Sequence, residues 1–341
     1  MSNQHKSVIN LSKKGYFLLS KKRYDEAEKA FLEAYSLEKQ NSFVLVGLGH
    51  VYRELNNFPE SIRFYEKIHL LEPNNTFSLK GLGHAYRGMR EYEKTIVYWQ
   101  QLMDIDSRDH HMMVRLADAY KKVGRVDEAE KYYIKALKVD SDDKYGNLGL
   151  GGLYYKSGNY DECLKCLGKF IRHEENNVAV LTMIGNLHQR HKEFETALNY
   201  FKKVIDIESK NPYALYGMGN CYRGLENYQE TVYWWLLVLE GEPDNQGLFT
   251  RVGDAYMHLD NLEQAQRHYQ SSLDLAYDTY ALLGLARIHF QKGEFDQAIT
   301  GCQQVLDQDP GHRRALQLLV DVSSAQGIDE KANEFRQRLA H

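Results

Sequence analysis

A pattern that repeats with a period of about 34 residues, a length typical of helical solenoids, constrains the fold of this chain more than any other feature. One period carries Gly49 onto Gly83 and Tyr52 onto Tyr86, and the same register continues to Gly253. Nine repeats begin at residues 8, 42, 76, 110, 144, 178, 212, 246 and 279, and a shorter tenth repeat begins at 313. In a solenoid each repeat packs only on its neighbours.

Small residues recur at two positions of these repeats. The eighth position is Gly or Ala in nine of the ten repeats, and the twentieth position holds a small residue in all ten. Small side chains allow two helices to approach to about 8–10 Å. Asn, Asp, Gly and Pro gather at the junctions between repeats, as in residues 72–75, and these residues are helix stop and N-cap signals. Each repeat is therefore predicted to form two antiparallel helices joined by a short turn.

The period and the two small positions resemble the tetratricopeptide repeat family, closely over residues 8–312 and loosely over residues 313–341. This resemblance implies an all-α, right-handed superhelical solenoid of antiparallel helix pairs, whose first helices line a concave groove. It also implies binding of peptides or proteins without catalysis. We expect a polar N-terminal tail (residues 1–7), nine tetratricopeptide-like repeats (8–312), and a degenerate tenth repeat with C-terminal capping helices (313–341).

Composition narrows the function classes. The chain has 43 Lys and Arg against 47 Asp and Glu, a formal net charge of −4, whereas nonspecific nucleic-acid binding needs a large cationic surplus. Four cysteines in 341 residues form no disulfide framework, and a reducing compartment follows. Neither a signal peptide nor a run of about 18 apolar residues is present. These features predict a cytoplasmic protein without membrane insertion, either a monomer or a weak homo-oligomer.

Three sets of residues invite a chemical interpretation. The cysteines and glycines fit packing better, and the histidines fit a surface or groove position better. Cys163 and Cys166 form a C-x-x-C inside a predicted second helix, and Cys163 occupies the small twentieth position. Glycine pairs such as Gly47-x-Gly49 recur with the repeat. A phosphate-binding loop must follow a strand, and no strand is predicted before these glycines. Two histidine pairs, at residues 110–111 and at residues 188 and 191, have no third metal ligand at a spacing typical of a metal site. No catalytic residue, metal site or cofactor is predicted.

The groove is predicted to carry the binding site. The second, fifth, ninth and twelfth positions of each first helix share one helical stripe, which is expected to face the concavity. In the second to fourth repeats this stripe is basic, whereas in the sixth to ninth it is aromatic and hydrogen-bonding with little net charge. The residues predicted to contact a partner are His50, Arg53, Lys80, His84, Arg87, Lys121, Asn186, Tyr216, Asn220 and Arg223.

Two of these arginines have alternative roles. Arg87 and Arg223 either bind ligand or form ion pairs with Asp118 and Asp254, one repeat further on. The other basic residues of the stripe, Arg53, Lys80 and Lys121, have no acidic neighbour within it. Some co-chaperone tetratricopeptide domains hold a C-terminal carboxylate with Lys-x-x-x-Asn and Lys-x-x-x-Arg motifs. Lys80-x-x-x-His84 approaches this pattern but lacks the asparagines.

These observations favour an interaction scaffold that holds an extended, acidic or C-terminally anchored protein segment in its groove. An RNA-binding helical repeat protein, and an enzyme or its regulatory subunit, remain alternatives. Binding is expected to strengthen as the pH falls from about 8 to 6, because His50, His84 and His111 would gain charge. A step of four repeats carries Arg87 onto Arg223 and Trp99 onto Trp235, which predicts a duplicated block of four repeats whose two arginines face one another across the groove.

Overall fold

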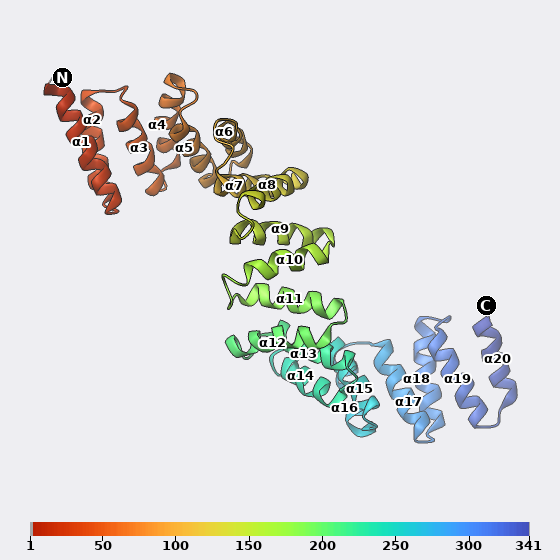
Figure 1. Ribbon diagram of the computed structural model, residues 1–341. Helices are drawn as coiled ribbons and strands as arrows, with labels where there is room; N and C mark the ends of the chain where they lie inside the picture. The colour runs from red at the N-terminus through yellow and green to blue at the C-terminus, as the bar shows by residue number, and fades with distance from the viewer. Residues whose placement is uncertain (1–2, 341) are drawn as a thin grey trace. The chain divides into compact units, whose positions relative to one another are not determined.

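Every repeat forms a pair of antiparallel helices (Figure 1). A computed structural model describes residues 3–340, which form twenty α-helices and contain no strand. Except in the first repeat, each first helix begins at the residue where the sequence places the start of the repeat, from Ser42 to Arg313. The predicted all-α solenoid of helix pairs is therefore confirmed.

The chain divides into two compact units, residues 1–173 and 174–341, which are called the N-terminal and C-terminal modules below. The helices of the N-terminal module are α1 (Asn3–Ser20), α2 (Tyr24–Leu37), α3 (Ser42–Glu54), α4 (Phe58–Leu71), α5 (Thr76–Gly88), α6 (Tyr92–Ile105), α7 (His110–Lys122), α8 (Val126–Val139), α9 (Lys144–Ser157) and α10 (Tyr160–Phe170). Those of the C-terminal module are α11 (Val178–Arg190), α12 (Phe194–Ile207), α13 (Pro212–Gly224), α14 (Tyr228–Gly241), α15 (Gln246–His258), α16 (Leu262–Leu275), α17 (Thr279–Gln291), α18 (Phe295–Gln308), α19 (Arg313–Ala325) and α20 (Asp329–Ala340).

The two ends of the chain differ from a plain repeat. Helix α1 begins at Asn3, so residues 3–7, expected as a polar tail, are helical. At the other end α19 and α20 form a complete helix pair, in which Ala332 is fully buried. Phe335 and Leu339 of α20 pack against the core of the preceding repeats. The last helix therefore covers the end of the hydrophobic core.

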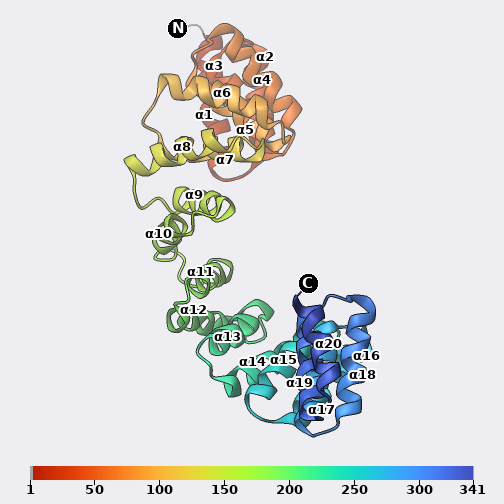
Figure 2. The same cartoon turned by 90° about the vertical axis from the view of Figure 1, so that its right-hand side faces the viewer.

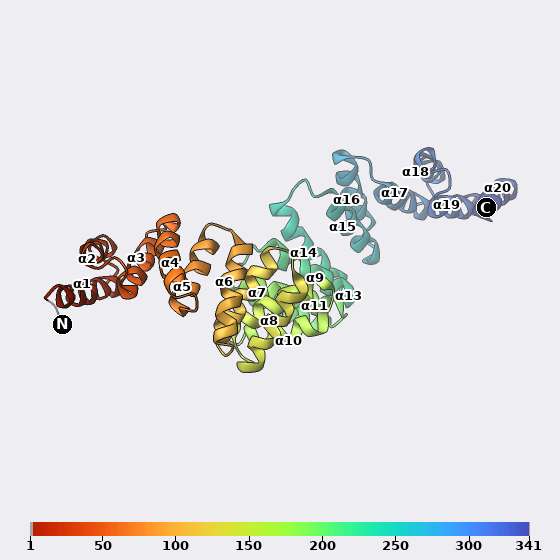
Figure 3. The same cartoon turned by 90° about the horizontal axis from the view of Figure 1, so that it is seen from above.

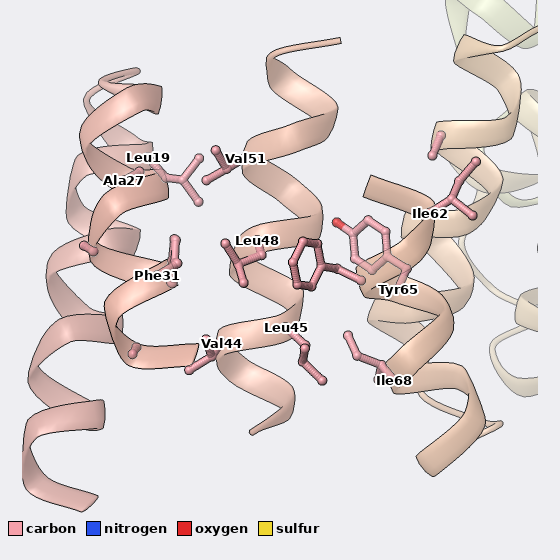
Figure 4. Close-up of a cluster of buried hydrophobic side chains, with 14 of the residues drawn as sticks. Leu19, Ala27, Phe31, Val44, Leu45, Leu48, Val51, Ile62, Tyr65 and Ile68 are labelled. Atoms are coloured by element: carbon pink, nitrogen blue, oxygen red, sulfur yellow. The ribbon is translucent and has the colours of Figure 1, made fainter. Parts of the chain in front are cut away.

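Small residues bring the two helices of each repeat together. The residue at the twentieth position has no exposed surface in any of the ten repeats: Ala27, Ser61, Thr95, Ala129, Cys163, Ala197, Thr231, Ala265, Ala298 and Ala332. Larger side chains fill the space around these crossings. Figure 4 shows Leu48 and Val51 of α3 lying between Phe31 of α2 and Tyr65 of α4.

Local signals set the helix ends. The N-cap side chains of α3, α5, α7, α9, α11, α13, α15 and α17 are Asn or Asp, and each accepts a hydrogen bond from a backbone N–H of the first turn. Between the two helices of every repeat, the fifteenth residue adopts a positive φ. These ten residues are Lys22, Asn56, Arg90, Gly124, Gly158, Lys192, Glu226, Asp260, Gly293 and Gly327.

Packing within each module is between near neighbours. The substantial helix–helix contacts in residues 3–340 join helices that are adjacent or next but one in the chain. Figures 2 and 3 show this for α19 and α20, which lie side by side in both views. Side chains of consecutive first helices therefore share one surface, and the candidate site lies there. No helix in the described part of the chain is long and apolar enough to cross a bilayer.

Candidate partner-binding site

An aromatic cavity of about 810 Å³ opens on the first helices α1, α3 and α5 of the N-terminal module. Phe43 and Phe77, both at the second position of their repeats, line this aromatic cavity and are 75% and 69% exposed. Val46 and Tyr65 form further parts of its wall. Large apolar side chains that stay this exposed mark a surface suited to the apolar side chains of a partner.

A basic cavity of about 540 Å³ adjoins the aromatic one, since Arg53 and Lys80 line both. The basic cavity is also lined by His84, Arg87 and Arg115. Of the predicted contact residues, His50 lines the aromatic cavity, and Lys121 lies outside both. The structure therefore brings five of the six predicted N-terminal residues to one continuous surface.

Arg115 also belongs to this surface and was not predicted. It occupies the sixth position of its repeat, outside the stripe expected to face the groove. From α7 it nevertheless lines the basic cavity with Arg87 of α5. Only the recurrence of this arginine pair four repeats later, as Arg223 and Arg251, offered a sequence signal for it.

Three of the predicted cations have acidic partners, and for Lys121 the partner lies within the stripe, which corrects the expectation that it has no acidic neighbour there. The Arg53 guanidinium lies 2.7 Å from a Glu54 carboxylate oxygen. The Lys80 ammonium lies 3.8 Å from Asp109, the N-cap of α7, and Lys121 contacts Asp118 at 3.4 Å. Glu54 and Asp109 lie outside the stripe, whereas Asp118 occupies its ninth position. The net positive charge of the surface is therefore smaller than its basic residues suggest.

Arg87 does not form the ion pair with Asp118 that the sequence offered as an alternative. Asp118 instead accepts a hydrogen bond from the Tyr133 hydroxyl and pairs with Lys121. The Arg87 guanidinium lies 5.8 Å from the centre of the Trp99 ring. Among residues 3–340 neither Arg87 nor Arg115 forms an ion pair. The pKa of Arg87 lies below its usual value, because the guanidinium is desolvated and lies near Arg115.

His84 stays neutral at pH 6, which contradicts the gain of charge expected of this histidine. Burial, together with the nearby guanidinium of Arg115, lowers the pKa of His84 to about 3. The His84 ring packs edge-on against Trp99, with the ring centres 5.2 Å apart. Burial also lowers the pKa of His50. The His84 imidazole therefore adds no positive charge for an acidic partner between pH 8 and 6, and burial disfavours the charged form of His50.

A further cavity, of about 710 Å³, lies in the C-terminal module. It is lined by four arginines: Arg223, Arg251, Arg287 and Arg314. Arg251 and Arg314 lie outside the stripe of the sixth to ninth repeats, so they add positive charge that the stripe did not predict. Of the other predicted contacts, Asn186, Tyr216 and Asn220 do not line this cavity. The Tyr216 hydroxyl accepts a hydrogen bond from Arg251, and the Tyr216 ring stacks on Trp235.

Arg223, like its counterpart, does not pair with the aspartate one repeat further on. Asp254 accepts a hydrogen bond of 2.6 Å from the Tyr269 hydroxyl, as Asp118 does from Tyr133. The aspartate at the ninth position therefore binds the tyrosine at the twenty-fourth position of its own repeat. Among residues 3–340, no ion pair joins Arg223 to any carboxylate.

Within the described part of the chain, one group of side chains could hold a metal ion. His110 and His111 lie with Asp143 so that one ligand atom from each is within 4.8 Å of the others. Asp143 is the N-cap of α9 and is buried. Sequence spacing revealed no third ligand for these histidines because Asp143 lies at the start of the next repeat, and only the stacking of successive repeats brings it near.

The four cysteines are buried, and their thiols stay protonated at neutral pH. Cys163 and Cys166 lie in α10, and burial raises the pKa of each thiol to about 11. Cys221 and Cys302 are also free and buried. Because the thiolate is the nucleophile and the metal ligand, these pKa values favour the predicted packing role of the C-x-x-C sequence.

Two family models, both described as tetratricopeptide repeat, match this chain. One matches residues 114–162 and 252–313, and the other matches residues 11–41 and 178–211. The chain belongs to the tetratricopeptide repeat family. Proteins of this family are generally non-catalytic, and their repeats serve as interaction scaffolds for other proteins.

Several solved tetratricopeptide structures are similar in fold. YrrB, described as a TPR protein with an unusual peptide-binding site, is 22% identical, with a match that covers 54% of this chain and 95% of YrrB and a TM-score of 0.49. A tetratricopeptide repeat protein from Parabacteroides merdae ATCC 43184 is 14% identical, with 73% and 98% covered and a TM-score of 0.47. MamA is 22% identical, with 47% and 94% covered and a TM-score of 0.45. No curated protein sequence matches the chain.

Proposed function

We propose that this tetratricopeptide scaffold binds an acidic protein segment that also carries aromatic or other apolar side chains. The observation that carries the proposal is the pair Arg87 and Arg115, which line the basic cavity without an ion-pair partner among the described residues. A guanidinium binds a carboxylate through two parallel hydrogen bonds. The exposed rings of Phe43 and Phe77 lie on the adjoining cavity and would receive the apolar side chains.

The proposal places the strongest electrostatic contribution at Arg87 and Arg115. Arg53 and Lys80 already have carboxylate partners at 2.7 and 3.8 Å, so a ligand carboxylate would have to share them. His84 would contribute as a neutral, half-buried ring. We further propose that the protein works in a reducing compartment such as the cytoplasm, where its four free cysteines stay reduced.

The test uses a defined peptide with three phenylalanines and six glutamates, labelled with fluorescein, and a control peptide in which glutamine replaces every glutamate. Fluorescence anisotropy should show binding of the acidic peptide that weakens strongly between about 0.05 and 0.5 M salt, because salt screens exposed charges. The double variant Arg87→Glu and Arg115→Glu should lose this binding by at least about tenfold, which corresponds to about 1.4 kcal/mol.

A matched double variant, Lys29→Glu and Lys131→Glu, changes the net charge by the same amount at exposed positions of α2 and α8. It should keep the affinity of the wild type. Equal losses in both double variants would reduce the effect to overall charge and refute a site at the basic cavity. Tight, salt-dependent binding of poly-uridine in place of the peptide would instead favour the RNA-binding alternative.

A further inference from the structure

The arginine-rich cavity of the C-terminal module gathers side chains from four successive first helices. Arg223 comes from α13, Arg251 from α15, Arg287 from α17 and Arg314 from α19, and all four line one space of about 710 Å³. Each repeat thus contributes one guanidinium to the same cavity. Like charges brought together in this way repel one another unless an anion lies among them.

The carboxylates near this cavity do not neutralise the arginines. Asp254 and Glu226 are the acidic residues of its lining. Asp254 is occupied by the Tyr269 hydroxyl, which donates a hydrogen bond of 2.6 Å. In the described part of the chain, Arg223, Arg287 and Arg314 form no ion pair. Four cations therefore face two carboxylates, and the cavity keeps a positive charge.

The local arrangement repeats that of the basic cavity in the N-terminal module. A step of four repeats carries Arg87 onto Arg223 and Arg115 onto Arg251, and each pair lines one cavity. The same step carries other parts of the surroundings: Asp118 onto Asp254, Tyr133 onto Tyr269 and Trp99 onto Trp235. In both modules the aspartate accepts its hydrogen bond from the equivalent tyrosine. Two equivalent arginine pairs are thus built on the same scaffold.

We propose that the arginine-rich cavity is a second anion-binding site, which takes carboxylate or phosphoryl groups of a protein segment. Guanidinium groups bind both kinds of oxyanion through paired hydrogen bonds. This inference rests on the proposed function of the chain as a scaffold for acidic segments and extends it to two sites, one in each module. A partner with two anionic clusters would then bind more tightly than one with a single cluster, because the second contact is intramolecular.

Isothermal titration calorimetry of the full chain tests this with two short peptides, one with six glutamates and one with two phosphoserines among glutamines. The wild type should bind two copies of whichever peptide carries the preferred anion. The variant Arg223→Ala and Arg287→Ala should bind one copy, and so should the variant Arg87→Ala and Arg115→Ala. The variant Arg267→Ala, at an exposed position of α16 that pairs with Glu263, should keep both.

The outcomes separate the two proposals. If the Arg223 and Arg287 variant still bound two copies, the second site would be refuted, while loss of one copy on changing Arg87 and Arg115 would leave the proposed function standing. If instead only the Arg223 and Arg287 variant lost a copy, the second site would hold and the site in the N-terminal module would fail. Binding of the phosphoserine peptide over the glutamate peptide would identify phosphoryl groups as the ligand. Arg287→Lys, which keeps the charge, guards against a variant that fails to fold.

Discussion

Gly83 and Trp99 show how single residues set the distance between the helices of a repeat. A Cβ atom added to Gly83 would lie closer than 3.0 Å to the Trp99 indole nitrogen, far inside contact distance. Trp99 is fully buried, so the ring has no free space into which to move. The eighth position thus holds Gly in this repeat because the bulky residue of the second helix takes the space that a side chain would need.

Substitution of this glycine gives the first prediction. Gly83→Ala should destabilise the protein by about 1–3 kcal/mol, because the methyl group overpacks the crossing. Gly152→Ala is the matched control, since Gly152 is also helical but no atom lies within 4 Å of its added Cβ. That substitution should stabilise by up to about 1 kcal/mol through helix propensity. Urea unfolding followed by circular dichroism measures both, and a neutral Gly83→Ala would contradict the packing described for Trp99.

His84 gives a second prediction, for the dependence of stability on pH. In the unfolded chain this imidazole takes up a proton near its usual pKa of about 6.5, whereas burial lowers its pKa to about 3 in the folded protein. As the pH falls below about 6.5 the unfolded state binds more protons, so the free energy of unfolding decreases, by at most about 1.4 kcal/mol per pH unit for this group.

The variant His84→Gln removes this proton uptake. Its melting temperature should therefore fall less than that of the wild type between pH 7.5 and 5.5. Part of the dependence should remain, because burial lowers the pKa of His50 in the same direction. Parallel curves for the two proteins would show that His84 is protonated as readily in the folded state as in the unfolded chain.

At the scale of helices and turns, two kinds of residue set the helix ends, and only one kind can be recognised from the sequence. The Asn and Asp caps of the first helices stand at the repeat junctions and were predicted from residue type. The left-handed residue of each turn was not, because six of the ten are not glycine. Arg90, for example, has a φ of 63°, and the packing of the two helices it joins outweighs its intrinsic preference.

The caps themselves give a third prediction. The Asn177 side chain accepts a hydrogen bond from the backbone N–H of Val180 at 3.1 Å, at the start of α11. Asn159 stands at the same kind of position before α10 but makes no such hydrogen bond. Asn177→Ala should therefore cost about 1 kcal/mol, and Asn159→Ala clearly less. Equal losses in the two variants, measured by thermal unfolding, would mean that the side-chain cap contributes little here.

The candidate site is harder to predict from the sequence than the helices, because it depends on contacts between helices. Periodicity assigns residues to a helical stripe, and it correctly brought Arg53, Lys80 and Arg87 to one surface. It does not encode how far a side chain reaches between helices, so Arg115 was missed at the basic cavity and Asp109 was missed as the partner of Lys80. Contacts between neighbouring repeats decide which cations stay unpaired, and these contacts exist only in three dimensions.

At the scale of the whole molecule, the near-neighbour packing of the helices shapes how the chain loses its structure. The two modules, residues 1–173 and 174–341, are each compact, and the substantial contacts of the described helices stay between close neighbours in the chain. In such solenoids stability is close to a sum of the repeats and their interfaces. Local opening then does not require the whole molecule to unfold.

The last prediction follows from this architecture and uses hydrogen exchange measured by mass spectrometry. Gly83→Ala strains the crossing of α5 and α6, so their amides and those of the adjacent α4 and α7 should exchange faster than in the wild type. Amides of α11 to α20 should exchange at unchanged rates, because no packing contact carries the strain through repeats that keep their own cores. Faster exchange of the same size along all twenty helices would show that the chain unfolds as one cooperative body and that its modules are not energetically separate.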